Sequence, residues 1–311
     1  MKIGFFGTPR LSAKVLQDCI TAGLEVVYVV SQPDKPVGRS AKLVSSPVSN
    51  IALTQGIPLF RPEKIWDNEE FFLQVANHVV DYLVVVAYGK ILPDKILKLP
   101  TVLPINIHGS LLPKYRWASP IQSVLLAGES LTGVTIMQMT KGMDEWAILS
   151  TESIAIEPQE TSETLFKKFE QISGPFLIQT LTLYQKGEIT LREQDDSLAS
   201  YTSKFTKADG EIAPLQETAL AVYHKYQAYT PWPGLWFSLE GRRYSLSGVS
   251  LLDAENIPAW YAKRWSDGAL QLGCWVGVLN IEKITPEWKG ERLAADVFFA
   301  STEFDIKQLF V

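Results

Sequence analysis

The chain has 311 residues, 46% of them hydrophobic and 20% charged, and a formal net charge of −5. This composition is ordinary for a soluble globular protein and excludes a surface coated with positive charge, although not a local basic patch. The only two cysteines, Cys19 and Cys274, exclude a disulfide framework and favour a reducing compartment. The first residues lack the apolar run of a signal peptide, and no run reaches the ~18 apolar residues of a membrane helix. We therefore expect a cytoplasmic protein without membrane contact.

The first half of the chain alternates short apolar runs with amphipathic segments. We expect strands at 1–6, 24–30, 58–60, 82–87 and 103–107. We expect helices at 11–22, 50–55 and 67–77. The polar stretch 32–46, which contains two prolines, predicts a long loop. Alternating strands and helices predict an α/β fold with a parallel sheet and right-handed crossovers.

The second half of the chain changes in character. A strand pair at 133–139 and 148–156 and a helix at 161–186 close a first domain over residues 1–187. The polar stretch 188–205 predicts a linker. Residues 206–311 start with a helix at 216–226 and continue with short alternating runs, which are typical of a small β-barrel. These runs cover 236–239, 243–247, 269–272, 276–283 and 295–299.

One motif carries most of the chemical information. In residues 104–120, PINIHGSLLPKYRWASP, an apolar strand ends at Asn106 and His108. Because strand side chains alternate with a period of two, both leave the same face. Open α/β sheets bind ligands at the carboxyl ends of their strands, so this polar pair predicts a site.

The residue types of this motif suit acid–base chemistry. The imidazole of His108 can accept or donate a proton near neutral pH, and the Asn106 amide can donate to an oxyanion. Asp144, between the later two strands, offers a carboxylate that could orient the imidazole. The alternative is that His108 is a satisfied histidine at a strand end and Asp144 a turn residue. Chemistry alone leaves both readings open.

Two further features are less specific. Gly7-Thr8-Pro9 follows the first strand, but without a GxGxxG pattern it favours a tight turn over a nucleotide loop. Six basic residues could steer a phosphate backbone, or each could be an ordinary solvated charge. They are Arg39, Lys42, Lys114, Arg116, Lys204 and Lys207. The histidines lack metal-ligand spacing and no CxxC occurs, so we expect no metal.

These residues resemble the methionyl-tRNA formyltransferases, within the folate-dependent formyltransferases. The match follows the family's order through MKIGFFGTP, QPDKPVGRSAKLVSSPV, VVVAYGKILP, INIHGSLLPKYR, SPIQ, TGVTIMQMTKGMD, TKADGEI and TPWPGLWF. The resemblance implies a Rossmann-like N-terminal domain and a C-terminal barrel similar to an OB fold. It also implies a monomeric enzyme that transfers a formyl group from 10-formyltetrahydrofolate to the amino group of initiator methionyl-tRNA.

The resemblance also implies roles for individual residues. Asn106, His108 and Asp144 match the catalytic trio. The positions that match the folate-binding motif and cleft are Ser110, Leu111, Leu112, Pro113, Tyr88, Ile91 and Leu92. Arg39 and Lys42 match the loop that meets the acceptor stem, and the other four basic residues complete the expected tRNA-binding set. The implied barrel would grip the tRNA flank mainly through backbone contacts.

Four tryptophans depart from the family pattern, because Trp117, Trp146, Trp275 and Trp288 stand where glycine is expected. Glycine at such places supplies a positive φ or room for close approach, and tryptophan suits neither use. Either the chain has diverged and its site is reshaped, or these codons are UGA and the organism reads them as glycine. We favour the second hypothesis, because drift rarely makes the same replacement repeatedly.

Two other functions stay open at this point. Within the same fold, the formyl acceptor could be an amino-sugar nucleotide or a glycinamide ribonucleotide. From a different class, the chain could be a catalytically weak tRNA-binding protein if Trp117 and Trp146 are literal. The matching C-terminal domain and the basic stretch 32–46 favour tRNA.

Overall fold

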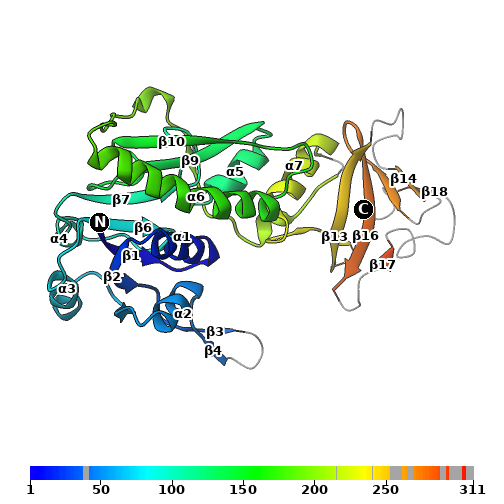
Figure 1. The fold of residues 1–311 in the computed structure, drawn as a ribbon. Helices are drawn as coiled ribbons and strands as arrows, with labels where there is room; N and C mark the ends of the chain where they lie inside the picture. The colour runs from blue at the N-terminus through cyan, green and yellow to red at the C-terminus, as the bar shows by residue number, and fades with distance from the viewer. Residues whose placement is uncertain are drawn as a thin grey trace. The chain divides into compact units, whose positions relative to one another are not determined.

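The computed structural model describes residues 1–37, 42–214, 216–239, 241–252, 261–264, 269–287, 292–293 and 303–305. They form two compact units (Figure 1). The first unit contains Met1–Pro120, Leu131–Ile156 and Leu165–Thr202. The second contains Ile121–Ser130, Glu157–Thr164 and the chain from Ser203 onward. Most of the stretch predicted as a linker, 188–202, therefore packs within the first unit, because its polar side chains bond to that unit's loops.

The first unit is built on a seven-stranded sheet with the order β10-β9-β7-β6-β1-β2-β5. Five strands run parallel: β1 (Lys2–Gly7), β2 (Glu25–Val30), β5 (Leu59–Phe60), β6 (Tyr82–Val86) and β7 (Leu103–His108). The later pair, β9 (Leu131–Gln138) and β10 (Ile148–Ala155), is antiparallel and extends one edge. The predicted α/β class with a mainly parallel sheet is confirmed.

Within the described residues, six α-helices come before Ser203, where the longest segment of the second unit begins. They are α1 (Arg10–Thr21), α2 (Pro47–Thr54), α3 (Glu69–Ala76), α4 (Asp94–Leu97), α5 (Pro120–Leu126) and α6 (Ser162–Gln185). In Figure 1, α1 and α6 lie over the near face of the sheet. Phe71 of α3 and Ile96 of α4 join the apolar cluster of Phe6 and Val85. The wholly buried β6 lies in the middle of the sheet, as its continuous apolar run predicts.

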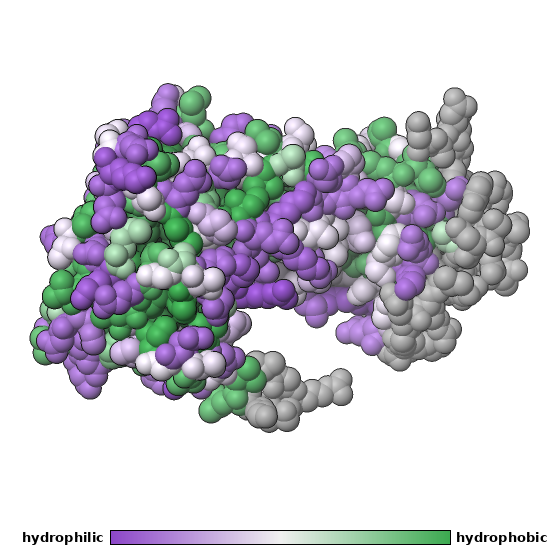
Figure 2. Space-filling view, viewed as in Figure 1, coloured by the Kyte–Doolittle hydropathy of each residue, from purple (hydrophilic) through white to green (hydrophobic). Residues whose placement is uncertain are grey.

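The stretch 32–46, predicted as a loop, contains a short hairpin. Strands β3 (Lys35–Val37) and β4 (Lys42–Val44) pair antiparallel. Leu43 and Val44 are 66% and 46% exposed, and Figure 2 shows apolar surface at this hairpin. Strands of three residues are too short to show a clear alternating pattern, which explains why the sequence did not reveal them.

The second unit combines α7 (Ala219–Tyr229) with an antiparallel sheet. Its strands are β12 (Leu235–Leu239), β13 (Arg242–Leu252), β14 (Tyr261–Arg264), β15 (Leu270–Gly273), β16 (Val278–Pro286), β17 (Arg292–Leu293) and β18 (Glu303–Asp305). The strand order is β12-β13-β16-β15-β14-β18, with β17 paired to β16. The predicted small β domain is confirmed, and its sheet has open ends within the described residues. The predicted run 295–299 lies outside them.

Two expectations drawn from composition can be compared with the described residues. None of their helices is long and apolar enough to cross a membrane. Cys19 and Cys274 are both free and buried. Burial raises the pKa of each thiol to about 12, so both cysteines stay protonated and unreactive at neutral pH.

Candidate active site

Asn106 and His108 lie at the carboxyl end of β7, on one face of the sheet. Asn106 pairs with Val85 of β6 and Met137 of β9, and both of these neighbours belong to the buried apolar cluster of the first unit. Because His108 follows two residues later, its side chain leaves the same face, as predicted. His108 is 6% exposed, whereas Asn106 is partly exposed. The Asn106 amide makes no hydrogen bond to any residue that the structure describes.

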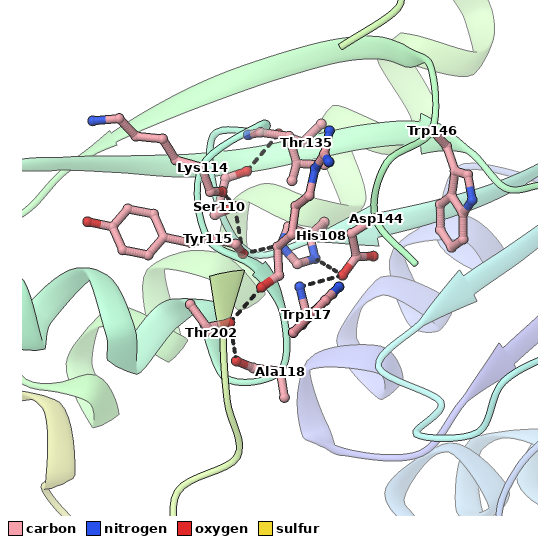
Figure 3. Close-up of polar contacts among 12 residues, drawn as sticks. His108, Ser110, Lys114, Tyr115, Trp117, Ala118, Thr135, Asp144, Trp146 and Thr202 are labelled. Carbon is pink, nitrogen blue, oxygen red and sulfur yellow. Dashed lines mark hydrogen bonds and ion pairs between the residues drawn. The ribbon is translucent and has the colours of Figure 1, made fainter. Parts of the chain in front are cut away.

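The third predicted residue, Asp144, lies beside His108 (Figure 3). Its Oδ2 lies 3.6 Å from Nδ1 of His108 and accepts a hydrogen bond from the backbone N–H of Trp117 at 2.8 Å. On the other side of the ring, Nε2 of His108 lies 2.9 Å from the carbonyl oxygen of Tyr115. Both ring nitrogens of His108 thus face acceptor oxygens, and these two contacts fix the orientation of the imidazole ring.

The backbone around this trio is strained. Tyr115, Trp117, Ser119 and Asp144 all have positive φ angles, between 58° and 81°. Such conformations cost free energy for residues with a side chain, and they persist only where the surroundings hold them. Trp117 has the largest of these φ angles, 81°, and is 47% exposed. This is the backbone conformation that glycine prefers, as the departure from the family pattern implies.

The loop after β7 is fixed by short polar contacts. The hydroxyl of Ser110 donates to the carbonyl of Lys114 at 2.6 Å. The hydroxyl of Thr135 on β9 donates to the carbonyl of Ser110 at 2.6 Å and accepts from the N–H of Leu112 at 3.2 Å. Ser110 is fully buried, and its role in folate binding stays a prediction.

Three of the predicted folate-binding residues come together in the structure. Tyr88, Leu92 and Leu112 belong to one buried apolar cluster, whereas Ile91 is 59% exposed. Trp146 lies in the same cluster, and its indole N–H is buried without a partner among the described residues. An unpaired buried N–H costs free energy, so position 146 is a second place where tryptophan fits poorly.

The basic residues divide between the surface and the interior. Lys114, Lys204 and Lys207 are exposed, Lys42 begins β4, and Arg39 lies outside the described residues. Arg116 requires a correction, because it is only 1% exposed. Its guanidinium donates to Oε1 of Gln194 at 2.9 Å and to Oδ1 of Asp196 at 2.6 Å. It therefore cannot reach a phosphate group while these contacts hold.

The sequence did not point to Gln194, Ser200 and Thr202, which the structure brings to the site. Ser200 accepts from the N–H of Tyr115 at 2.9 Å, and the Thr202 hydroxyl donates to the carbonyl of Arg116 at 2.7 Å. Two short strands, β8 (Arg116–Trp117) and β11 (Tyr201–Thr202), pair here. Partners some eighty residues apart leave no local pattern, so only the polar composition of 188–205 was visible.

Two other ionisable groups near β6 respond to burial. Burial raises the pKa of the Tyr88 phenol, whose hydroxyl has no partner among the described residues. Burial and the neighbouring charge of Lys35 lower the pKa of Lys90. Lys90 donates to the carbonyls of Pro62 and Glu63 at 3.0 and 2.7 Å. In the described part of the chain, no group of three or more His, Cys, Asp or Glu side chains could hold a metal ion.

The chain matches known proteins along nearly its whole length. Residues 1–181 match the formyl transferase family, and residues 204–302 match the formyl transferase C-terminal domain. The methionyl-tRNA formyltransferase of Acidobacterium capsulatum is 35% identical over 303 residues, which cover 97% of each chain. The chain belongs to the methionyl-tRNA formyltransferase family. The methionyl-tRNA formyltransferase of Sulfurimonas denitrificans is 38% identical, over 94% of this chain and 95% of the relative's chain.

The fold of this formyltransferase also occurs in a solved structure of more distant sequence. WlaRD, a sugar 3N-formyl transferase solved in the presence of dTDP and 5-N-formyl-THF, superposes with a TM-score of 0.68 at 15% identity. The match covers 93% of this chain and 99% of WlaRD. At that identity the likeness shows a shared fold, so the acceptor must be argued from the relatives and the site.

Proposed function

We propose that this formyltransferase transfers the formyl group of 10-formyltetrahydrofolate to the free amino group of initiator methionyl-tRNA. The observation that carries the proposal is the His108–Asp144 pair at the carboxyl edge of the sheet, in a chain 35–38% identical to methionyl-tRNA formyltransferases over nearly its full length. The matched C-terminal domain favours a tRNA acceptor over a small amine.

The trio can perform the transfer through hydrogen bonding and proton movement. As the amine attacks, negative charge develops on the formyl oxygen. The Asn106 amide donates to it, and so does Nε2 of His108 once it leaves the Tyr115 carbonyl. The Asp144 carboxylate stabilises the imidazolium and takes up the proton that the amine loses. That proton returns to the departing folate nitrogen. One C–N bond forms and another breaks, with no oxidation or reduction.

The co-substrate supplies the formyl group, and the residues that would hold it follow β6 and β7. The cluster of Tyr88, Leu92 and Leu112 suits a flat aromatic ring, and the exposed Ile91 borders it in sequence. Leu111 and Pro113 complete the loop that would face the ring. The buried Trp146 occupies volume in the same cluster, so with tryptophan at this position we expect folate to bind weakly.

The tRNA would be held through charge. Lys42 and Lys114 of the first unit and Lys204 and Lys207 of the second supply positive charge, together with Arg39. Phosphate contacts of this kind weaken as salt rises. Arg116 is removed from this set because its guanidinium is buried. We further propose that the enzyme is a cytoplasmic monomer that needs no metal.

One assay tests the proposal. The full chain is incubated with 10-formyltetrahydrofolate and, in parallel, with charged initiator tRNA, an amino-sugar nucleotide or glycinamide ribonucleotide. Formylation of the tRNA alone supports the proposal. Transfer only to a small amine identifies the alternative acceptor. Binding of tRNA without any turnover identifies a catalytically weak binding protein, and a Trp117→Gly, Trp146→Gly double variant then tests whether the tryptophans are the cause.

A further inference from the structure

We propose that Gln194 is a positioning residue of the formyl-transfer centre. Its side-chain amide ties the Asp144 loop to β8 and thereby fixes the direction in which the Asp144 carboxylate faces His108. The reaction that it serves rests on the proposed function, whereas the structural role rests on the contacts alone.

The side-chain amide of Gln194 uses its full hydrogen-bonding capacity at this place. Its Nε2 donates to the backbone carbonyls of Asp144 and Trp146, at 2.9 and 2.7 Å. Its Oε1 accepts from Nη2 and Nε of Arg116, at 2.9 and 3.2 Å. A primary amide offers two donors and two acceptor positions, and all four are engaged here. No other residue type of this size presents donors and acceptors in this arrangement.

These four bonds close a loop of contacts around the catalytic carboxylate. Arg116 directly precedes Trp117, whose N–H holds Oδ2 of Asp144 at 2.8 Å. Gln194 joins the Arg116 side chain back to the carbonyl of Asp144 itself. Asp144 and Trp117 have φ angles of 60° and 81°. Such conformations need restraint from their surroundings, and Gln194 supplies it to both segments at once.

The buried guanidinium of Arg116 makes this connection rigid. Arg116 is 1% exposed, and a buried charge that loses its partners is strongly destabilising. Besides Gln194, its Nη2 contacts Oδ1 of Asp196 at 2.6 Å. The Asp196 side chain is 78% exposed and has no hydrogen bond to the Asp144 loop. Gln194 and Asp196 therefore share one partner, but only Gln194 reaches the catalytic carboxylate's segment.

Two variants of Gln194 separate the role of its donor, Nε2, from that of its acceptor, Oε1. Gln194→Glu keeps the acceptor for Arg116 but loses both donors to the carbonyls at 144 and 146. Gln194→Met keeps the length and loses both functions. Asp196→Asn is the matched control, because it weakens the other contact of the same guanidinium. If Gln194 acted only by pairing Arg116, then Gln194→Glu would behave like the wild type.

The experiment measures kcat, both KM values and the pH dependence of kcat for the full chain, below the temperature at which each variant melts. For Gln194→Glu and Gln194→Met we expect kcat to fall roughly 10- to 100-fold while both KM values change less than about threefold. We expect the pH–kcat profile of Gln194→Glu to be displaced, because the Asp144 carboxylate no longer faces His108 correctly. For Asp196→Asn we expect wild-type kcat within about threefold.

Two results would overturn the proposal. One is a Gln194→Glu variant with wild-type kcat and an unmoved pH profile. The other is an equal loss of kcat in Gln194→Glu and Asp196→Asn, which would assign the effect to Arg116 burial. The proposed function fails separately, if the wild type formylates no methionyl-tRNA. Formyl transfer to whichever acceptor the wild type then uses would still test Gln194, because its contacts to Asp144 and Arg116 do not depend on the acceptor.

Discussion

The backbone N–H of Trp117 donates to Oδ2 of Asp144 at 2.8 Å, and both residues hold positive φ angles. The carboxylate proposed to be catalytic is thus anchored by a backbone segment that is itself in a conformation unfavourable for tryptophan. The geometry of the proposed acid–base pair depends on that segment, so changes at either position should alter turnover.

Replacing Asp144 by asparagine should lower kcat strongly with little change in KM. The amide keeps the size of the side chain but cannot stabilise an imidazolium or take up a proton, so we expect a loss of about 100-fold or more. Steady-state kinetics with methionyl-tRNA measures it. Asp195→Asn is the control, because this exposed carboxylate only caps Ser197 in the same unit. Comparable losses in both variants would contradict the role of Asp144.

Replacing Trp117 by glycine should leave stability no lower than in the wild type, and should raise kcat. Relief of the strained φ contributes roughly 1–3 kcal/mol. The freedom of glycine in the unfolded chain and the lost ring contact with Tyr201, at 4.7 Å between centroids, oppose it. Urea unfolding measures the sum. Trp66→Gly is the matched control, since Trp66 is also exposed and has an ordinary φ. For Trp66→Gly we expect a lower free energy of unfolding than in the wild type.

The codon hypothesis predicts the mass of the natural protein. If UGA is read as glycine, peptides from the source organism that span positions 117 and 146 carry glycine. The strained φ at Trp117 and the unpaired indole at Trp146 support these two positions. Position 275 has no positive φ, and position 288 lies outside the described residues, so both rest on the family pattern alone. Mass spectrometry of the native protein, with the codons in the gene, decides it. UGG codons would reject the hypothesis.

Replacing Trp146 by glycine should tighten folate binding while weakening the free protein. Loss of a buried tryptophan side chain costs roughly 3–5 kcal/mol, because it leaves a cavity. Binding of tetrahydrofolate should recover part of this free energy, since Trp146 belongs to the same buried cluster as Tyr88, Leu92 and Leu112. The readout is the rise in Tm on adding tetrahydrofolate, which should be larger in Trp146→Gly than in the wild type. Trp146→Phe, which keeps the cluster filled, should show no such gain.

The second unit should lose stability in mild acid through His224 on α7. Burial lowers the pKa of His224, whose ring packs against Gly128. The unfolded chain, with a histidine pKa of about 6.5, then binds the proton more readily than the folded chain. Neutral His224 therefore contributes its full share to the free energy of unfolding above about pH 6.5, the unfolded-state pKa. This share is lost as the pH falls from there toward the lower folded-state pKa. Urea unfolding at neutral and acidic pH should show a smaller pH dependence in His224→Gln. An unchanged dependence would contradict this.

The sequence determined the parts of the molecule that depend on local pattern. Continuous apolar runs such as 82–86 and the amphipathic segment that becomes α1 identified the elements of the α/β sheet. Spacing alone placed Asn106 and His108 on one face, because side-chain direction in a strand follows from the backbone period. Ordered motifs across the chain also identified the family. Hairpin β3–β4 was missed because strands of three residues carry no period.

Tertiary structure alone decided which residues surround the carboxylate of Asp144. The sequence classed Arg116 with the surface bases, whereas folding buries it between Gln194 and Asp196. It also classed 188–205 as a linker, although Gln194 holds the Asp144 loop and Thr202 holds β8. Such contacts join residues 50 to 86 positions apart. Their partners are chosen by the packing of the whole unit, so no local pattern in the chain encodes them.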